Sequence, residues 1–350
     1  MSDIACIPGG AGGVGFTFTK YLLERGWDII TIDNNFRKQF FGADGDVSAN
    51  FDFLREHTDF YELDIREHEK IEEIFKKYGN RIKLISHNAA QPAHDFASQN
   101  VMLDFDINAR ATLNLLECFR KYCPDAVFEF MSTNKVMGDA CNRIPLKEFQ
   151  TRYEYDDMHF INGIDENLTI DRSGHSLFGC SKASADLAVQ EFGRYFGLKT
   201  VCFRGGCLSG RAHAGCQAHG FLDYICKCAV KQTKYYVNAY KLKQVRDNLD
   251  FSDLCEAFYE FYKNPRSGEV YNIGGSHENS ISILEIIAYL EQKHNLKLEY
   301  EYLQEPRKFD HIVYYSCNNK FKMHYPNWEV KKSVHQIIDE IVEKYKNERK

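Results

Sequence analysis

The chain has 350 residues, 44% of them apolar and 27% charged, so it can bury a large core and is not a disordered polypeptide. Its length favours one large α/β domain with a second lobe. The 44 Lys and Arg residues against 50 Asp and Glu residues give a net charge of −6 without a long basic run, which excludes non-specific nucleic-acid binding. No apolar run reaches the roughly 18–20 residues of a membrane span, and the first residues lack a signal-peptide pattern. We therefore expect a soluble cytoplasmic protein with no nucleic-acid or membrane partner.

Up to about residue 200, short apolar strands alternate with longer helical patterns. This alternation predicts an α/β fold with a doubly wound parallel sheet, of the Rossmann type, with right-handed crossovers. The expected strands span residues 3–7, 28–32, 60–63, 82–86, 126–131 and 199–203. The expected helices span residues 16–25, 68–78, 108–122 and 181–196.

Two long segments interrupt this alternation: an insertion at 37–53 and a polar, aromatic-rich loop at 144–176. After Arg204 the chain becomes rich in Gly, Ala, Cys and His, and we interpret this part as a smaller C-terminal lobe. Its expected helices span residues 221–230, 281–294 and 333–345.

The 12 cysteines are scattered, and none forms a Cys-x-x-Cys pair of the kind that binds zinc. We interpret them as reduced thiols, most of them small apolar side chains of the core. His213, Cys216 and His219 form a local cluster, but three residues on one loop make a weak metal site, and we expect no metal.

The first expected strand runs into the sequence GGAGGVG at residues 9–15, with a helix directly after it. Gly9 allows a tight turn, Gly12 lets the backbone approach a pyrophosphate, and Gly15 permits close packing of the helix on the strand. The helix N-terminus offers unpaired N–H groups to the phosphates. A glycine-rich turn can also be only a turn, so the pattern needs support from elsewhere in the chain.

That support comes from Asp33, at the end of the second strand and 18 residues after Gly15. A carboxylate there binds the adenosine ribose hydroxyls of NAD and repels the 2′-phosphate of NADP, so we expect NAD. Asp64 after the third strand is a candidate for contact with the adenine, or alternatively the N-cap of the following helix. We expect an NAD-binding Rossmann domain at 1–204, with part of 244–275 returning to it, and a substrate-binding lobe at 205–243 and 276–345.

At this point the chain resembles the extended short-chain dehydrogenase/reductase family. The motifs that carry the resemblance are GGAGGVG at 9–15, HNAA at 87–90, MSTNKVMG at 131–138, GCSK at 179–182, KQVRD at 243–247 and YNIGG at 271–275. The STNKV and KQVRD sequences point most narrowly to CDP-paratose 2-epimerases, also called CDP-tyvelose 2-epimerases. The resemblance implies these cofactor-binding residues: Gly9, Gly12, Gly13, Val14, Gly15, Asp33, Asn34, Arg37, Asp64, Ile65, Ala89, Ala90, Asn108 and Lys182.

The resemblance also implies a catalytic Ser/Thr, Tyr and Lys, with the last two spaced Tyr-x-x-x-Lys. Thr133 and Lys182 match, but the tyrosine position holds Phe178, whose ring has no proton to exchange. Two interpretations stay open: a deliberate substitution that traps a bound sugar, or a natural variant with another base or a changed chemistry. As alternatives, Thr133 is strand-end packing and Lys182 an ordinary helix-surface lysine.

The substrate implied by the resemblance is a nucleotide sugar, with a CDP-sugar favoured. Arg246 and Arg307 match the family's diphosphate-binding arginines, whose planar guanidinium groups suit phosphate, or they form surface ion pairs. Thr133 and Asn134 are expected to contact the sugar. His94 and His219 are expected at the substrate, or else are solvated loop residues.

The implied function is NAD-dependent 2-epimerisation by transient oxidation at C2. Another nucleotide-sugar epimerase, such as a 4-epimerase, and a non-catalytic NAD- or nucleotide-sugar-binding protein are the alternatives. Asn134 and Lys135 follow Thr133 where dehydratases carry Asp-Glu, which argues against dehydration. The helices at 108–122 and 181–196 match those that pair in dimers of the family, so we expect a homodimer.

Overall fold

The computed structural model describes residues 3–217 and 219–348, which divide into two compact units. The first comprises Met1–Val136, Leu177–Arg204 and Cys255–Tyr271, and the second Met137–Ser176, Gly205–Leu254 and Asn272–Lys350. The expected domain boundaries differ from these units, because residues 137–176 belong to the second unit rather than to the first. The assignment of NAD to one unit and substrate to the other stays a prediction.

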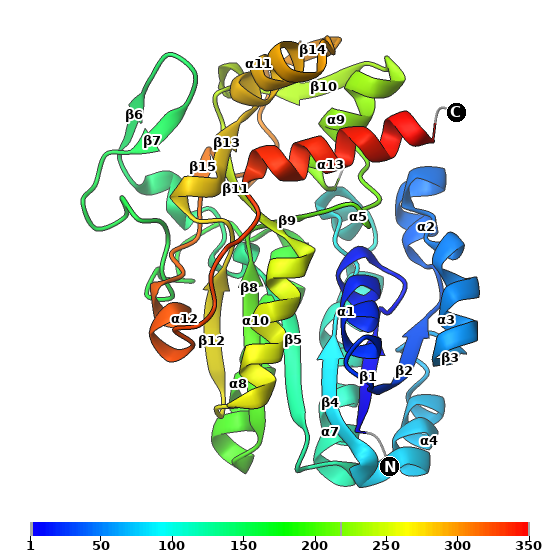
Figure 1. Ribbon diagram of the computed structural model, residues 1–350. Coiled ribbons are helices and arrows are strands. Elements are labelled where there is room, and N and C mark those ends of the chain that lie inside the picture. Colours follow the sequence, from blue (N-terminus) through cyan, green and yellow to red (C-terminus); the bar gives the residue numbers. More distant parts are fainter. Residues whose placement is uncertain (1–2, 218, 349–350) are drawn as a thin grey trace. The chain divides into compact units, whose positions relative to one another are not determined.

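The first unit is built on a seven-stranded sheet with the strand order β12-β8-β5-β4-β1-β2-β3 (Figure 1). β1 pairs in parallel with both β2 and β4, so that Cys6 lies opposite Ile30 on one side and Ile85 on the other. The expected Rossmann-type α/β fold is confirmed. The strands are β1 Ile4–Pro8, β2 Asp28–Asp33, β3 Asp59–Glu62, β4 Ile82–His87, β5 Val127–Thr133, β8 Lys199–Gly205 and β12 Glu269–Ile273.

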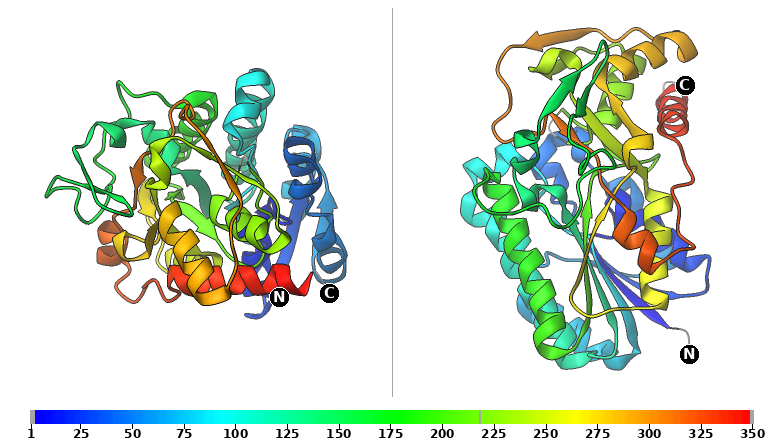
Figure 2. Two further views of the ribbon diagram at one scale, coloured as in Figure 1. Left: turned by 90° about the horizontal axis from the view of Figure 1, so that it is seen from above. Right: turned by 90° about the vertical axis from the view of Figure 1, so that its left-hand side faces the viewer.

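Helices cover both faces of this sheet: α1 and α10 lie over one face, and α7 and α8 over the other (Figures 1 and 2). On the first face, the Phe18 and Phe258 rings meet edge to face at 5.2 Å, and on the second, Phe119 packs on Phe128 at 5.5 Å. The helices are α1 Gly13–Leu23, α2 Arg37–Phe41, α3 Phe51–His57, α4 His68–Tyr78, α5 His94–Gln99, α6 Val101–Phe105, α7 Ala111–Tyr122, α8 Ser176–Phe196 and α10 Phe251–Lys263, with a π-helical turn at Asp106–Arg110.

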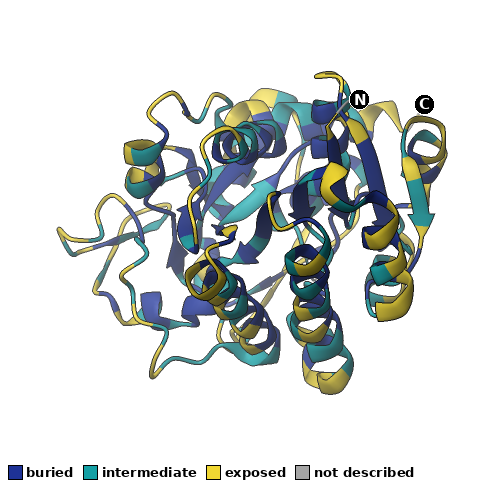
Figure 3. Ribbon diagram, turned by 90° about the horizontal axis from the view of Figure 1, so that it is seen from below, coloured by how far each residue is buried: buried dark blue, intermediate teal, exposed yellow. Residues whose placement is uncertain are grey.

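The core lies between these layers because every residue of β1 is apolar and buried, as expected for a central strand of a parallel sheet. Buried residues follow the strands and the inward faces of the helices, and exposed residues gather on the outward helix faces (Figure 3). All 12 cysteines lie among the described residues as thiols outside any disulfide, and of these Cys180 is the exposed one. Burial raises the pKa of Cys123 to about 12, so this thiol stays protonated in the core.

The second unit contains a mixed sheet in which β11 pairs with β13, β15 and β9, a parallel pair β10–β14, and an antiparallel hairpin β6–β7. Ser282 and Ser333 begin the helices α11 and α13 with capping boxes, completed by Glu285 and Gln336. The strands are β6 Leu146–Glu148, β7 Tyr153–Tyr155, β9 Cys207–Ser209, β10 Tyr235–Asn238, β11 Val245–Asp250, β13 Ser280–Ser282, β14 Tyr300–Leu303 and β15 Val313–Tyr314; the helices are α9 Phe221–Lys231, α11 Ile283–His294, α12 Asn319–His324 and α13 Val334–Asn347.

Two segments expected as loops carry secondary structure. The insertion at 37–53 contains α2 and the beginning of α3, and the segment at 144–176 contains the β6–β7 hairpin. These elements are short, so none of them shows enough periodicity in the sequence to be separated from a loop. Within the described residues, no helix has the length and apolar character to cross a membrane.

Candidate functional site

The turn after β1 has the tight geometry that its glycines predict. Gly9 lies at φ +83°, a conformation that residues with a Cβ rarely adopt, and its N–H donates to the Ile32 carbonyl at 2.8 Å. A Cβ on Gly9 would clash with the backbone of Ala89, and a Cβ on Gly15 would clash with the Gly9 carbonyl. These two glycines therefore allow β1, α1 and the loop after β4 to pack closely.

Gly12 differs from these two glycines because there is open space beside its Cα atom. A Cβ there would meet only the Gly9 carbonyl oxygen, at 3.6 Å. Gly12 is also the N-cap of α1, where no side chain caps the helix, and Gly12, Gly13 and Val14 are partly exposed. The open N-terminus of α1 thus offers backbone N–H groups and a positive dipole end, which suits the pyrophosphate of a dinucleotide.

Asp33 stands at the end of β2 beside this turn. Its carboxylate accepts hydrogen bonds from the N–H of Ala11 at 3.0 Å and of Asn35 at 2.9 Å. Burial raises the pKa of Asp33, and the backbone N–H groups act in the opposite direction. The carboxylate is therefore tied to the glycine turn at the position where the sequence predicts contact with the ribose.

Asn34 connects this region to Asp64, because its side-chain amide donates to the Asp64 carboxylate at 3.0 Å. Arg66 binds the same carboxylate through two nitrogens, at 3.0 and 2.7 Å. Burial opposes ionisation of Asp64, but the hydrogen bonds from Arg66 outweigh it and lower the pKa. The N-cap of α4 is Glu67, so the alternative interpretation of Asp64 as that cap is wrong.

Other expected cofactor residues lie around this end of the sheet. The Ala89 N–H donates to the Pro8 carbonyl at 2.9 Å, and both Ala89 and Ala90 are partly exposed directly after β4. Ile65 is buried after β3, and the Arg37 guanidinium lies over the Phe41 ring at 4.7 Å.

Asn108 is fully buried, and its amide bonds to protein groups. It accepts from the Gln91 N–H at 2.9 Å and donates to Ser181 Oγ at 3.0 Å and to an Asp104 carboxylate oxygen at 3.1 Å. Gln91 also donates to the Asp104 carboxylate, at 2.6 Å. Asn108 therefore holds the loop after β4 against α8, and the sequence did not identify Gln91, Asp104 and Ser181 as its partners.

Phe178 and Lys182 lie one turn apart on α8, and both are buried. Lys182 Nζ donates to the Met131 carbonyl at 2.8 Å and lies 4.0 Å from the centre of the Phe130 ring. Burial lowers the pKa of Lys182 to about 7, although Asp186 favours the charged form. The alternative of an ordinary helix-surface lysine is therefore wrong. The Phe178 ring packs against the imidazole of His94 at 5.1 Å between ring centres.

Thr133 ends β5, and Asn134 begins the 3₁₀ turn that follows. Thr133 Oγ1 accepts from the Lys135 N–H at 3.2 Å and lies 3.4 Å from Asn134 Oδ1. Thr133 is partly exposed, so its hydroxyl is not sealed in the core. Since Lys182 donates to Met131 on the same strand, β5 and α8 bring the expected catalytic positions together.

Beneath these positions lies a buried ion pair that the sequence did not predict. Asp186 accepts from Ser132 Oγ at 2.6 Å and from Arg204 at 2.7 and 3.1 Å. Asp186 follows Lys182 by four residues and so shares its helix face, which is the pattern that could have indicated it. This pair fixes β5, α8 and β8 to one another.

Arg246, Arg307 and His219 belong to the second unit. Arg246 Nη2 pairs with the Asp310 carboxylate at 3.0 Å, and Nη1 donates to the Val245 carbonyl at 2.9 Å. The Asp310 N–H in turn donates to the Arg307 carbonyl at 3.2 Å, so one short segment connects the two arginines. Arg307 Nη2 donates to the Gln217 carbonyl at 3.0 Å.

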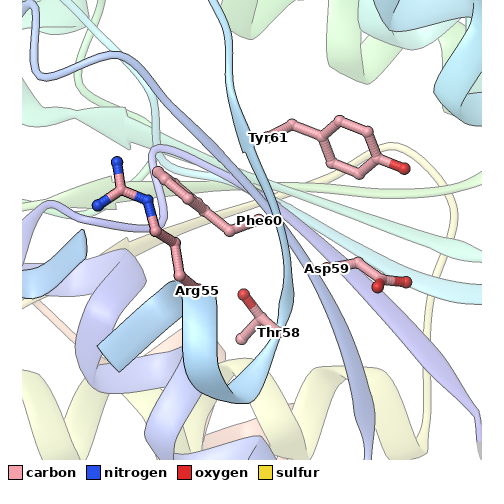
Figure 4. Close-up of a pocket in the computed structure, with 5 residues that line it drawn as sticks. All are labelled: Arg55, Thr58, Asp59, Phe60 and Tyr61. Atoms are coloured by element: carbon pink, nitrogen blue, oxygen red, sulfur yellow. The ribbon is translucent and has the colours of Figure 1, made fainter. Parts of the chain in front are cut away.

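His219 packs edge to face on His213 at 5.5 Å. The described residues contain no group of three or more His, Cys, Asp or Glu side chains placed to hold a metal ion. A shallow pocket of about 280 Å³ lies elsewhere, along the edge strand β3. Phe60 and Tyr61 point to opposite sides of this strand, with Arg55 on the Phe60 side (Figure 4), and none of the candidate site residues lines the pocket.

The model of the NAD dependent epimerase/dehydratase family matches residues 5–274. The chain belongs to this family. This epimerase/dehydratase family member is 33% identical over 305 residues to CDP-paratose 2-epimerase of Salmonella typhi, covering 84% of this chain and 85% of that protein. It is 25% identical over 342 residues to UDP-glucuronate 4-epimerase of Thermodesulfobacterium geofontis, covering 96% and 94%.

Solved structures show the same fold. The UDP-glucose 4-epimerase of Thermotoga maritima with UDP-glucose superposes with a TM-score of 0.77 at 23% identity, over 99% of this chain and all of that one. The UDP-glucuronic acid 4-epimerase of Bacillus cereus, in complex with UDP-glucuronic acid and NAD, gives a TM-score of 0.79 at 18% identity, over 98% and 99%. NAD is the cofactor of the family, and the open α1 N-terminus and Asp33 fit it.

Proposed function

We propose that this chain is a CDP-sugar 2-epimerase of the CDP-paratose/CDP-tyvelose type, acting by transient oxidation at C2. The observation that carries the proposal is the 33% identity to the Salmonella typhi enzyme over 84% of the chain. Two placements support it: Lys182 bonds to β5, whose last residue is Thr133, and Phe178 lies one turn before Lys182 on α8.

Oxidation at C2 is the chemistry that this substrate requires. In a 3-deoxy sugar no carbonyl lies next to C2, so its C–H bond is not acidic enough for simple proton abstraction. When bound, NAD supplies the redox step at C2 in both directions. We assign the NAD contacts to Gly9, Gly12, Gly13, Val14, Gly15, Asp33, Asn34, Arg37, Asp64, Ile65, Ala89, Ala90, Asn108 and Lys182.

The chain's own residues have distinct roles in this proposal. Thr133 donates a hydrogen bond to the reacting oxygen, and Asn134 orients the sugar. Lys182 contributes positive charge beside the reacting centre when its amine is protonated. Arg246 and Arg307 provide guanidinium groups for the diphosphate, and His219 contacts the substrate.

Phe178, at the position of the catalytic tyrosine, supports a second candidate function: a non-catalytic protein that binds NAD and a nucleotide sugar. Phe178 cannot take part in proton transfer. If the protein is an epimerase, it is therefore either an inactive form that traps its substrate or an enzyme in which another residue acts as the base. Thr133, Asn134 and Lys182 are all retained. This argues against a non-catalytic protein, because a catalytic site that is no longer under selection tends to lose several of its residues. A cytoplasmic location and a homodimeric state complete the proposal.

The test is conversion of CDP-paratose by the purified, NAD-loaded chain and by its Phe178→Tyr variant, with product stereochemistry determined by NMR. We expect a product inverted at C2 from at least one of the two proteins, and co-purified NAD in native mass spectrometry. Inversion at C4 of a UDP-sugar instead would favour the 4-epimerase. No conversion of any CDP-sugar by either protein would overturn the proposal.

A further inference from the structure

Oxidation of a sugar C–OH group needs a residue that accepts the hydroxyl proton, and Phe178 cannot be that residue. His94 is the candidate-site residue whose ring packs directly on Phe178, with 5.1 Å between ring centres and 53° between ring planes. The imidazole of His94 therefore contacts the ring that stands at the family's tyrosine position. Histidine is also the side chain that most often performs acid–base catalysis near neutral pH.

The backbone that carries His94 is fixed in place. Gln91 is buried, and its side chain bonds to both the N–H and the carbonyl of Ala93, the residue before His94. Gln91 is in turn held by Asn108, which bonds to Ser181 on α8. The loop before His94 is thus tied to the helix that carries Phe178.

The segment after His94 is anchored as well. Phe96, in the same short helix, packs edge to face on Phe40 at 4.7 Å between ring centres. His94 itself is only partly buried, whereas Phe178 is buried. A fixed but accessible imidazole is what proton exchange with a bound sugar requires.

Neighbouring ionisable groups are less suited to this task. The Cys180 thiol is exposed, and burial of part of its surroundings raises its pKa, so it stays protonated at neutral pH. Asp104 is fully buried and accepts hydrogen bonds from Gln91 and Asn108. Lys182 is turned to the Met131 carbonyl and the Phe130 ring.

We propose that His94 is the acid–base catalytic residue of this chain, in place of the tyrosine that residue 178 lacks. In the forward step the hydroxyl O–H bond breaks and its proton goes to an imidazole nitrogen of His94, while the C2–H bond breaks and its electron pair leaves as hydride to the NAD⁺ of the family reaction. In the reverse step, hydride returns to the opposite face of C2 and His94 gives the proton back to the oxygen. Atoms and charge balance over the cycle, and no further oxidant is consumed.

This inference rests on the proposed epimerase, so its test uses four NAD-loaded proteins: the unaltered chain, His94→Gln, Phe178→Tyr and the double variant. We expect the unaltered chain to convert CDP-paratose and His94→Gln to lose about 10²–10⁴-fold in kcat. The double variant should recover most of that loss, because the restored phenol takes over the proton. His68→Gln, which alters an exposed histidine at the start of α4, is the matched control and should retain full turnover.

Calorimetric titration with CDP-paratose is the second readout. His94→Gln should bind the nucleotide sugar within about threefold of the unaltered chain, since glutamine keeps a hydrogen-bonding side chain and only proton transfer is lost. A large loss of affinity with unchanged kcat would overturn the catalytic role and make His94 a binding residue. Equal turnover of His94→Gln and the unaltered chain would also overturn it.

Failure of the inference and failure of the proposed function give different results. If only proteins with Tyr at 178 turn over, His94 is not the base, and the epimerase assignment stands with a trapped site. If none of the four proteins converts a CDP-sugar, both the epimerase assignment and the role of His94 are overturned.

Discussion

Lys182 combines a charge with a buried position. The residue is 3% exposed. Its amine donates a hydrogen bond to the Met131 carbonyl and lies over the face of the Phe130 ring. Burial lowers its pKa from 10.5 to about 7. Close to neutral pH the side chain is therefore divided between its charged and neutral forms, so small changes around it alter its charge.

Replacing Lys182 with methionine should change how stability depends on pH. Between about pH 7 and 10.5 the unfolded chain binds a proton at Lys182 that the folded chain does not, so this residue makes stability rise with pH in that window. Lys182→Met should remove this rise. Relative to the variant, the NAD-free chain should gain roughly 2 kcal/mol in free energy of unfolding from about pH 7 to about pH 9.

Urea denaturation of both proteins at the two pH values measures this difference. The matched control is Lys70→Met, whose side chain is 62% exposed, and which should leave the pH dependence unchanged. A constant difference between Lys182→Met and the unaltered chain would show that Lys182 titrates alike in the folded and unfolded states.

At the scale of elements, the β1–α1 turn uses its glycines for two separate purposes. Gly9 and Gly15 permit close packing, since a Cβ on either would clash with backbone. Gly12 leaves space at the helix N-terminus. The two purposes can be tested with the same substitution at two positions.

Gly15→Ala should destabilise the fold by about 1–3 kcal/mol, because the new methyl group pushes α1 away from the Gly9 carbonyl. Gly12→Ala should leave stability nearly unchanged but weaken NAD binding by about tenfold, or ~1.4 kcal/mol, because the methyl group keeps the pyrophosphate at a distance. Thermal unfolding without NAD and fluorescence titration with NAD measure the two effects. Equal loss of stability in both variants would contradict the separation.

Six of the seven strands of the first unit's sheet were predicted from short, mainly apolar runs, whereas β12, Glu269–Ile273, was not among the expected strands. The expected α4 matches its observed bounds, His68–Tyr78. β5 was found despite Glu129 in its middle, whose two buried carboxylate oxygens have no hydrogen-bond partner among the residues that the structure describes. Burial raises the pKa of Glu129 well above its usual value, so the fold favours the neutral form of this carboxyl group. The sequence shows an ionisable residue there and cannot show this preference.

Other features depended on contacts between distant residues. The glycine turn and Asp33 follow from spacing alone. In contrast, the partners of Asn108 and the pairing of Asp186 with Arg204 require the folded packing of α8 on the sheet. The contact between His94 and Phe178 joins residues 84 positions apart that share no motif.

At the scale of the whole molecule, the expected homodimer has a candidate surface within the first unit. α7 exposes Leu113 at 43%, and α8 exposes Leu187 at 46%, and α8 also exposes Tyr195 and Phe196 at its C-terminal end. Large apolar side chains exposed on two neighbouring helices are typical of a surface that a second copy covers.

We expect sedimentation equilibrium to show a dimer and Leu187→Arg to shift it to monomer, because a charge in the middle of an isologous interface meets its own copy. Near-ultraviolet circular dichroism should remain unchanged, since Leu187 is not part of the core. Met323→Arg, at an exposed residue of α12, is the control and should remain dimeric. A monomer before any substitution would contradict the expectation.

Cys180 gives this protein a practical property. Eleven of its 12 thiols are at least partly shielded by the fold, and the exposed one lies on α8, two residues after Phe178 and two before Lys182. A maleimide dye under native conditions should therefore attach chiefly at one place, without removal of any other cysteine. The chain thus carries its own attachment point for a fluorescent reporter of events at the candidate active site.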